Sequence, residues 1–217
     1  DALNLFPDAD WQKDLKGHGT WQQAQFFELA HPDIEADGKN RSHHVVIFVF
    51  SHSQAEADFN QASSELFPHL IPLFHCRNKV LVVHEFRELI KRTLKQYAGD
   101  IQQLIQTLDH HIDRPRLDLR QLQKDLAEAL SISQQYETQL SFLKEYQTTL
   151  ETNLTNYQSW LHVMEETDRQ RNLTSNLTVF HNFKSEAETY KRQLLADADA
   201  MKVGLSSLET YIKTVTN

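Results

Sequence analysis

A repeat of apolar residues at alternating steps of three and four constrains this chain more than any other feature. It runs through residues 119–164 without a slip and returns over residues 173–215. The first run comprises Leu119, Leu122, Leu126, Ala129, Ser133, Tyr136, Leu140, Leu143, Gln147, Leu150, Leu154, Tyr157, Leu161 and Met164. A strict seven-residue period is typical of left-handed coiled-coil packing. The sequence therefore predicts long helices that pack against one another along these stripes.

A third helical segment with similar spacing precedes the other two and contains Ile90 and Leu94. It should end near Asp113, because Arg114 precedes Pro115 and the residue before a proline disfavours helical backbone. Apolar residues off the main stripe of the second helix need a second neighbour. They are Leu130, Ile132, Phe142, Tyr146 and Trp160. Three antiparallel helices, connected near residues 114–118 and 165–172, satisfy this requirement.

The chain before these helices has a different character. The run His44–Phe50 is rich in β-branched and aromatic residues and predicts a strand that is buried on both faces. A helix should follow, from a cap at Ser51 or Ser53 to about residue 67, where Pro68 and Pro72 interrupt it.

Three shorter stretches complete the first part of the chain. Residues 20–30 form a short helix or a strand, and residues 35–43 read as a turn or loop. The run Lys79–Val83 is too short for its periodicity to distinguish a strand from the start of the next helix.

The predicted fold class is α+β and predominantly α. A small N-terminal α/β unit occupies residues 1–83. A long antiparallel three-helix bundle occupies residues 84–217, and we expect its last helix to be cut off at the end of the chain, because no Gly, Pro or polar tail follows Val215.

Composition excludes several classes of function. The net charge is −8 and no Lys/Arg block exceeds two residues, so nucleic acid and anionic membrane surfaces are poor partners. Cys76 is the single cysteine, which rules out a disulfide framework and a multi-cysteine zinc site. No apolar run approaches the ~18 residues of a membrane span, so a membrane enters only through a segment absent from this chain.

The densest polar cluster is Asp109-His110-His111-Ile112-Asp113. On a helix, Asp109 and Asp113 share a face at a spacing of four residues, where they can hold a divalent cation through oxygen ligands or pair with His110. The alternative is a solvated helix end, because zinc needs three or four converging ligands. We expect no other cofactor.

An enzyme site in the first unit is the least supported hypothesis. It would use His44, His52 and a nearby acid such as Asp58, which flank or follow the predicted strand. His75 and Cys76 are adjacent, so they do not face each other as a nucleophile and its base would. No phosphate-binding or nucleophile motif occurs, and five glycines in 217 residues leave little room for a phosphate-binding loop. We predict no catalytic residue and no enzymatic activity.

The order of parts resembles the cytosolic portion of CorA-type divalent-cation channels and their CorA-like relatives. A strand-containing unit (His44–Phe50) comes first and long antiparallel helices follow, of which the last spans Leu173–Val215. The resemblance implies a pentamer whose last helix continues into a membrane span. The Gly-Met-Asn signature of that family does not occur in this sequence, and none of the family's metal sites can be placed on it.

Two hypotheses for function follow. The first is a cytoplasmic regulatory or assembly domain of an oligomeric membrane protein, in which the bundle couples a cytosolic signal to a membrane segment beyond Asn217. The second is a coiled-coil scaffold or adaptor that binds other proteins. Both imply self-association or protein partners, and both place the chain in the cytoplasm or on the cytoplasmic face of a membrane.

Overall fold

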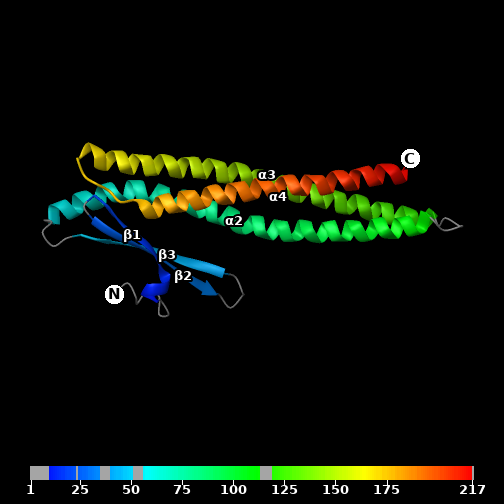
Figure 1. Ribbon diagram of the computed structural model, residues 1–217, viewed down its shortest axis with the longest axis horizontal. Helices are drawn as coiled ribbons and strands as arrows, with labels where there is room; N and C mark the ends of the chain where they lie inside the picture. The colour runs from blue at the N-terminus through cyan, green and yellow to red at the C-terminus, as the bar shows by residue number, and fades with distance from the viewer. Residues whose placement is uncertain (1–9, 23, 35–39, 51–55, 113–118, 217) are drawn as a thin grey trace. The chain divides into compact units, whose positions relative to one another are not determined.

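The computed structural model describes residues 10–22, 24–34, 40–50, 56–112 and 119–216. The elements are the short helix α1 (Trp11–Asp14), the strands β1 (Leu15–Trp21), β2 (Ala24–Ile34) and β3 (Asn40–Val49), and the long helices α2 (Glu56–Ile112), α3 (Leu119–Gln170) and α4 (Thr178–Thr216) (Figure 1). The predicted class is confirmed: the fold is predominantly α, with a small sheet before long helices that pack together.

The chain forms two compact units. Unit 1 comprises residues 1–76 and 155–186, and unit 2 comprises residues 77–154 and 187–217. Each long helix therefore supplies a segment to both units. The sequence prediction divided the chain once, after residue 83, whereas the later helices α3 and α4 return to complete the unit that holds the sheet.

The sheet of unit 1 is antiparallel, in the order β1-β2-β3, and Phe26 on β2 lies opposite Phe48 on β3. The predicted strand at His44–Phe50 is confirmed as part of β3. Its burial on both faces is wrong, because residues 44–48 are only half-buried and Val49 is 47% exposed. In an antiparallel sheet one face covers the core while the other faces outward.

One face of the sheet carries an aromatic core. The ring of Phe26 stacks on that of Phe180 at 5.1 Å between centroids. Trp21 is fully buried, and its indole Nε1 donates to the backbone oxygen of Met164 at 3.1 Å. The hydroxyl of Tyr157 donates to the backbone oxygen of Phe180 at 3.1 Å. These bonds satisfy the polar ends of rings that are otherwise in apolar surroundings.

A close backbone approach fixes β1 against the turn before α4. Thr20 and Asn176 exchange two backbone hydrogen bonds, of 3.0 and 2.8 Å. A Cβ atom on Gly19 would lie 2.1 Å from the backbone oxygen of Asn176, so only glycine fits there. Asn172, with φ at 55°, ends α3 in the left-handed conformation that is typical after a helix.

All described residues of unit 2 are helical. Its core residues include Ile90, Leu94, Ile101, Leu143, Leu150, Leu154, Leu194 and Ala198, each less than 9% exposed. Tyr136 is buried among them, and its hydroxyl donates to the backbone oxygen of Met201 at 3.0 Å. The predicted stripe on α3 is confirmed in part in this unit, because Leu122, Leu126, Leu140 and Gln147 are only half-buried. Its buried positions are Ala129, Ser133, Tyr136, Leu143, Leu150 and Leu154.

The predicted interruption at Pro68 and Pro72 is wrong, because α2 continues through both residues. Each proline removes one backbone hydrogen bond and crowds the preceding turn. Leu70 and Leu73 lie beside them and are 6% and 0% exposed, so the burial of this face outweighs the local cost. The same helix includes Lys79–Val83, so this run is helical and the strand alternative is wrong.

Two connections between the long helices were predicted. The helix α2 is described as far as Ile112, so the expected stop near Asp113 falls at the edge of the described residues and stays a prediction. The second connection begins later than expected, because α3 extends to Gln170 and α4 starts only at Thr178. Residues 20–30 form strand on both sides of the turn after Trp21. Residues 40–43 of the predicted 35–43 loop belong to β3, so that part of the prediction is wrong. The rest of that loop, the predicted helix caps at Ser51 and Ser53 and the 114–118 connection lie outside the described residues.

Candidate functional site

The predicted cation site is not among the described side chains. The backbone of Asp109 and His110 belongs to α2, but their side chains and all of Asp113 lie outside what the structure describes. Within the described residues, no group of three or more His, Cys, Asp or Glu side chains is arranged to hold a metal ion. The cation site therefore stays a prediction.

The structure gives His44 a partner that the sequence analysis missed. Its Nε2 lies 2.6 Å from Oε1 of Glu28, a residue that is only 1% exposed. The imidazole also packs against the ring of Phe74 at 5.3 Å. Glu28 sits on the inner face of β2, two positions from Phe26, so strict strand alternation was the signal that pointed to it.

This arrangement orients the imidazole through one carboxylate and one aromatic ring. A carboxylate that holds a histidine ring requires a third group at the other ring nitrogen to do acid–base or nucleophilic work. The other members of the hypothesis, His52 and the side chain of Asp58, are outside the described residues. Cys76 is buried whereas its neighbour His75 is exposed, in keeping with their expected divergence on a helix.

A buried polar cluster joins the β1–β2 turn to the end of α3 in unit 1. Gln22 donates from its side-chain Nε2 to Oδ1 of Asp168 at 2.8 Å, and Arg171 donates to Oε1 of Gln22 at 2.9 Å. Burial raises the pKa of the Asp168 carboxyl, although hydrogen bonds from Gln22 and Ser175 and the charge of Arg171 oppose the rise. The cluster provides hydrogen-bond partners for buried backbone and side-chain groups at two turns, and so it stabilises the fold.

A buried ionic cluster joins α2 to α4 in unit 2. Arg87, whose side chain is 5% exposed, donates to Asp197 at 2.7 Å and to Gln193 at 3.2 Å. Lys91 lies 2.9 Å from the other oxygen of Asp197. Burial acts to raise the pKa of Asp197, but the hydrogen bonds and charges of Lys91 and Arg87 outweigh it and lower that pKa. Arg87 also pairs with Glu88 at 2.7 Å, so two cations and two carboxylates balance one another in this cluster.

The feature that nothing in its own unit explains is an exposed apolar surface on unit 2. We call it the α2–α3 patch; its members are Val82, Phe86, Leu89, Phe142 and Tyr146. The first four are 47%, 45%, 55% and 40% exposed, and Tyr146 is half-buried. Within each helix, the patch members are three or four residues apart, so they lie on the same side of that helix. The ring of Phe86 stacks on that of Tyr146 at 5.7 Å, which joins the two helices.

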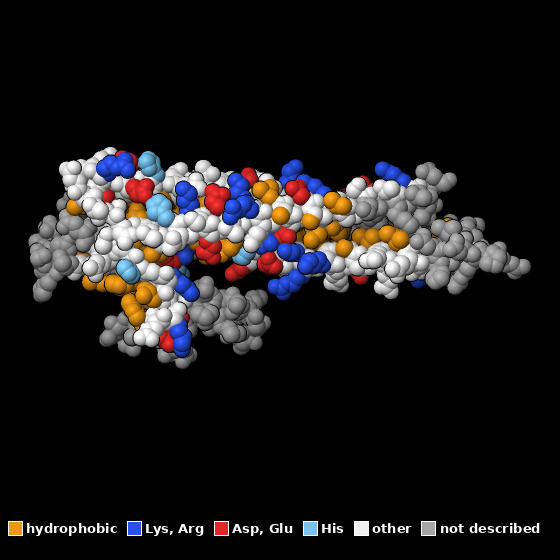
Figure 2. All heavy atoms as spheres, viewed as in Figure 1, with side chains coloured by type: hydrophobic (Ala, Val, Ile, Leu, Met, Phe, Trp, Pro, Cys, Tyr) orange, Lys and Arg blue, Asp and Glu red, His pale blue; other side chains and the backbone are white. Residues whose placement is uncertain are grey.

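The sequence predicted two of the five members of this patch but not their role. It identified Phe142 and Tyr146 as residues that need a second helix, and Phe86 supplies one for Tyr146. Phe142 and Leu130 remain 40% and 52% exposed, so the second neighbour does not cover them. Val82 and Leu89 were not recognised, because on α2 they follow the same spacing as the core stripe. Figure 2 shows other hydrophobic side chains that reach the surface among charged ones.

Comparison with protein-family models, with curated proteins and with solved structures finds no match for this chain. Among the described residues, none of the helices has a stretch long and apolar enough to span a membrane.

Proposed function

We propose that this chain is a protein-assembly module that contacts another protein chain through the α2–α3 patch. The observation that carries the proposal is Leu89, which is 55% exposed three residues after the exposed Phe86, on a helix whose opposite side is already packed. A contiguous apolar surface on a folded domain is typical of an interaction site, whereas single apolar residues scattered over a surface are not.

The patch has the properties of a preorganised contact surface, one that already has its bound conformation in the free chain. Phe86 and Tyr146 hold each other through ring stacking, and both sit on long helices rather than on loops. Little conformational freedom is lost when such a surface is covered, which favours binding. Two aromatic anchors beside aliphatic residues match the composition of the energetically important centre of protein interfaces.

The resemblance to CorA-like proteins extends this proposal. In that version the assembled helices transmit a cytosolic signal to a membrane segment outside this chain. The extension needs one further observation, namely a longer chain in which α4 leads into an apolar span of about 20 residues. Assembly through the patch does not depend on it.

The test is photo-crosslinking from inside the patch in living cells of the native host. A benzophenone amino acid replaces Leu89 in one variant and Leu130 in the control. Both residues are leucines of similar exposure, at 55% and 52%. Leu130 lies twelve residues from Phe142, about 120° around α3, and so outside the patch.

We expect position 89 to give a discrete protein adduct that position 130 does not give. A further Phe86→Asp substitution should abolish that adduct, because it places a charge in the apolar contact. Equal labelling from both positions, or no protein adduct from position 89, would reject the assembly function.

A further inference from the structure

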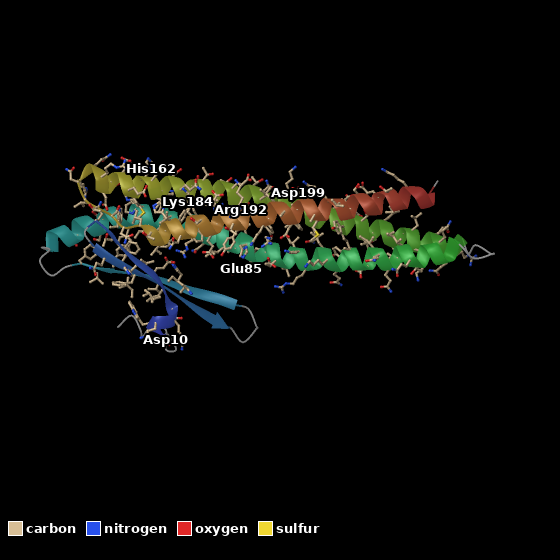
Figure 3. The ribbon with its side chains drawn as sticks, in the orientation of Figure 1. Asp10, Glu85, His162, Lys184, Arg192 and Asp199 are labelled. Carbon is tan, nitrogen blue, oxygen red and sulfur yellow. The ribbon has the colours of Figure 1, made fainter. Side chains whose placement is uncertain are left out.

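Two charged residues flank the α2–α3 patch. Glu85 and Arg92 are exposed on α2 (Glu85 is labelled in Figure 3). Within the described residues, no ion pair or hydrogen bond engages either side chain. This contrasts with Arg87 and Lys91 on the same helix, which both bind Asp197.

The spacing of these charges has a symmetry. Glu85 lies four residues before Leu89 and Arg92 lies three residues after it. Residues seven apart return to the same side of a helix, so the acid, the leucine and the base form a short row. When a second copy of the helix packs antiparallel about a two-fold axis near Leu89, each Glu85 comes to face the other copy's Arg92. A parallel copy would instead place like charges together.

The area of the patch fits a contact of this size. An aromatic side chain buries about 150–250 Å², so each exposed phenylalanine offers roughly 80–100 Å². With Val82 and Leu89 the patch offers roughly 350 Å², enough for the apolar centre of an interface that typically covers about 800 Å² per partner. The charged residues beside it would form the polar rim.

We propose that the occupant of the α2–α3 patch is a second copy of this chain, packed antiparallel along α2 about a two-fold axis near Leu89. Two symmetry-related ion pairs between Glu85 and Arg92 flank the apolar contact and set its direction. The inference rests on the proposed function, since it names the partner of the same surface.

Charge reversal tests the direction and the identity of the partner together. Glu85→Lys alone and Arg92→Glu alone each place like charges across the axis, so each variant should self-associate roughly ten-fold more weakly than the wild type. An equimolar mixture of the two variants should restore association, because every charge then faces its opposite. The double variant Glu85→Lys/Arg92→Glu should also restore it.

Sedimentation equilibrium gives the dissociation constants, and native mass spectrometry separates the mixed dimer from the two homodimers. Both residues are exposed, and thermal unfolding should be the same for all variants, which keeps the comparison free of misfolding. The inference is overturned by a wild-type chain that stays monomeric at about 100 μM, by single variants that associate like the wild type, or by a mixture no stronger than its components. A crosslinked adduct of Leu89 with a different protein would reject the second copy while leaving the assembly function standing.

Discussion

Unit 1 and unit 2 take segments of the same three helices, yet they bury apolar surface in different ways. Unit 1 adds a sheet, and one face of that sheet covers its helices with a cluster of packed aromatic rings. The described residues of unit 2 are all helical, and its described core is made of leucine, isoleucine, valine and alanine with one tyrosine. The helices of unit 2 therefore retain apolar side chains that nothing in the unit covers.

The comparison bears on the contact surface that we propose. The polar groups of unit 1 that are buried, such as Asp168, hold turns in place, and those of unit 2, such as Arg87, hold helices together. Both sets are occupied with structural tasks. The uncovered side of α2 and α3 is what remains for contact with another molecule.

The largest effect should come from the aromatic core of unit 1. Trp21→Ala removes a fully buried side chain and a hydrogen bond to Met164, and we expect it to lower the free energy of unfolding by about 3–5 kcal/mol. The matched control is Trp11→Ala, which removes a tryptophan that is 40% exposed and should cost about 1 kcal/mol or less. Urea denaturation measures both, and equal losses would refute the proposed core.

A smaller loss should follow from the ionic cluster of unit 2. Asp197→Ala removes the main acceptor of Arg87, a cation that has little access to water, and should lower the free energy of unfolding by about 2–3 kcal/mol. Asp199→Ala is the control, because Asp199 is exposed and pairs only with its neighbour Lys202 on the surface. If the two substitutions cost the same in urea denaturation, the cluster does not stabilise unit 2.

The two units should respond to acid in opposite directions, though the effects are smaller still. The lowered pKa of Asp197 contributes stability that is present above the ordinary aspartate value of 3.8 and is lost as the pH falls through the lowered pKa. The raised pKa of Asp168 disfavours the fold while the carboxyl is charged, so stability is gained as the pH falls through the raised pKa toward 3.8.

Asparagine variants separate these contributions. Between neutral pH and about pH 3, the stability of the wild type relative to Asp168→Asn should rise, and its stability relative to Asp197→Asn should fall. Denaturant midpoints collected across this range give both differences. Slopes of the same sign would show that one carboxyl has been assigned the wrong environment.

The sequence predicted the long helices well because a heptad stripe depends only on local spacing. It missed the continuation of α2 through Pro68 and Pro72, since the burial of Leu70 and Leu73 depends on parts of the chain distant in sequence. It missed the pair of Glu28 and His44 for the same reason: the register of two strands brings them together. Phe142 and Tyr146 were found as unusual residues, but their exposure depends on how completely α2 covers them.

The most direct test of the central claim is hydrogen–deuterium exchange of the wild-type chain at low and high concentration. Covering the α2–α3 patch by another copy should slow the exchange of amides in residues 82–92 and 139–149 as the concentration rises, while the strands of unit 1 exchange at an unchanged rate. Exchange that is independent of concentration in both helical segments, or slowed only in the strands, would contradict it.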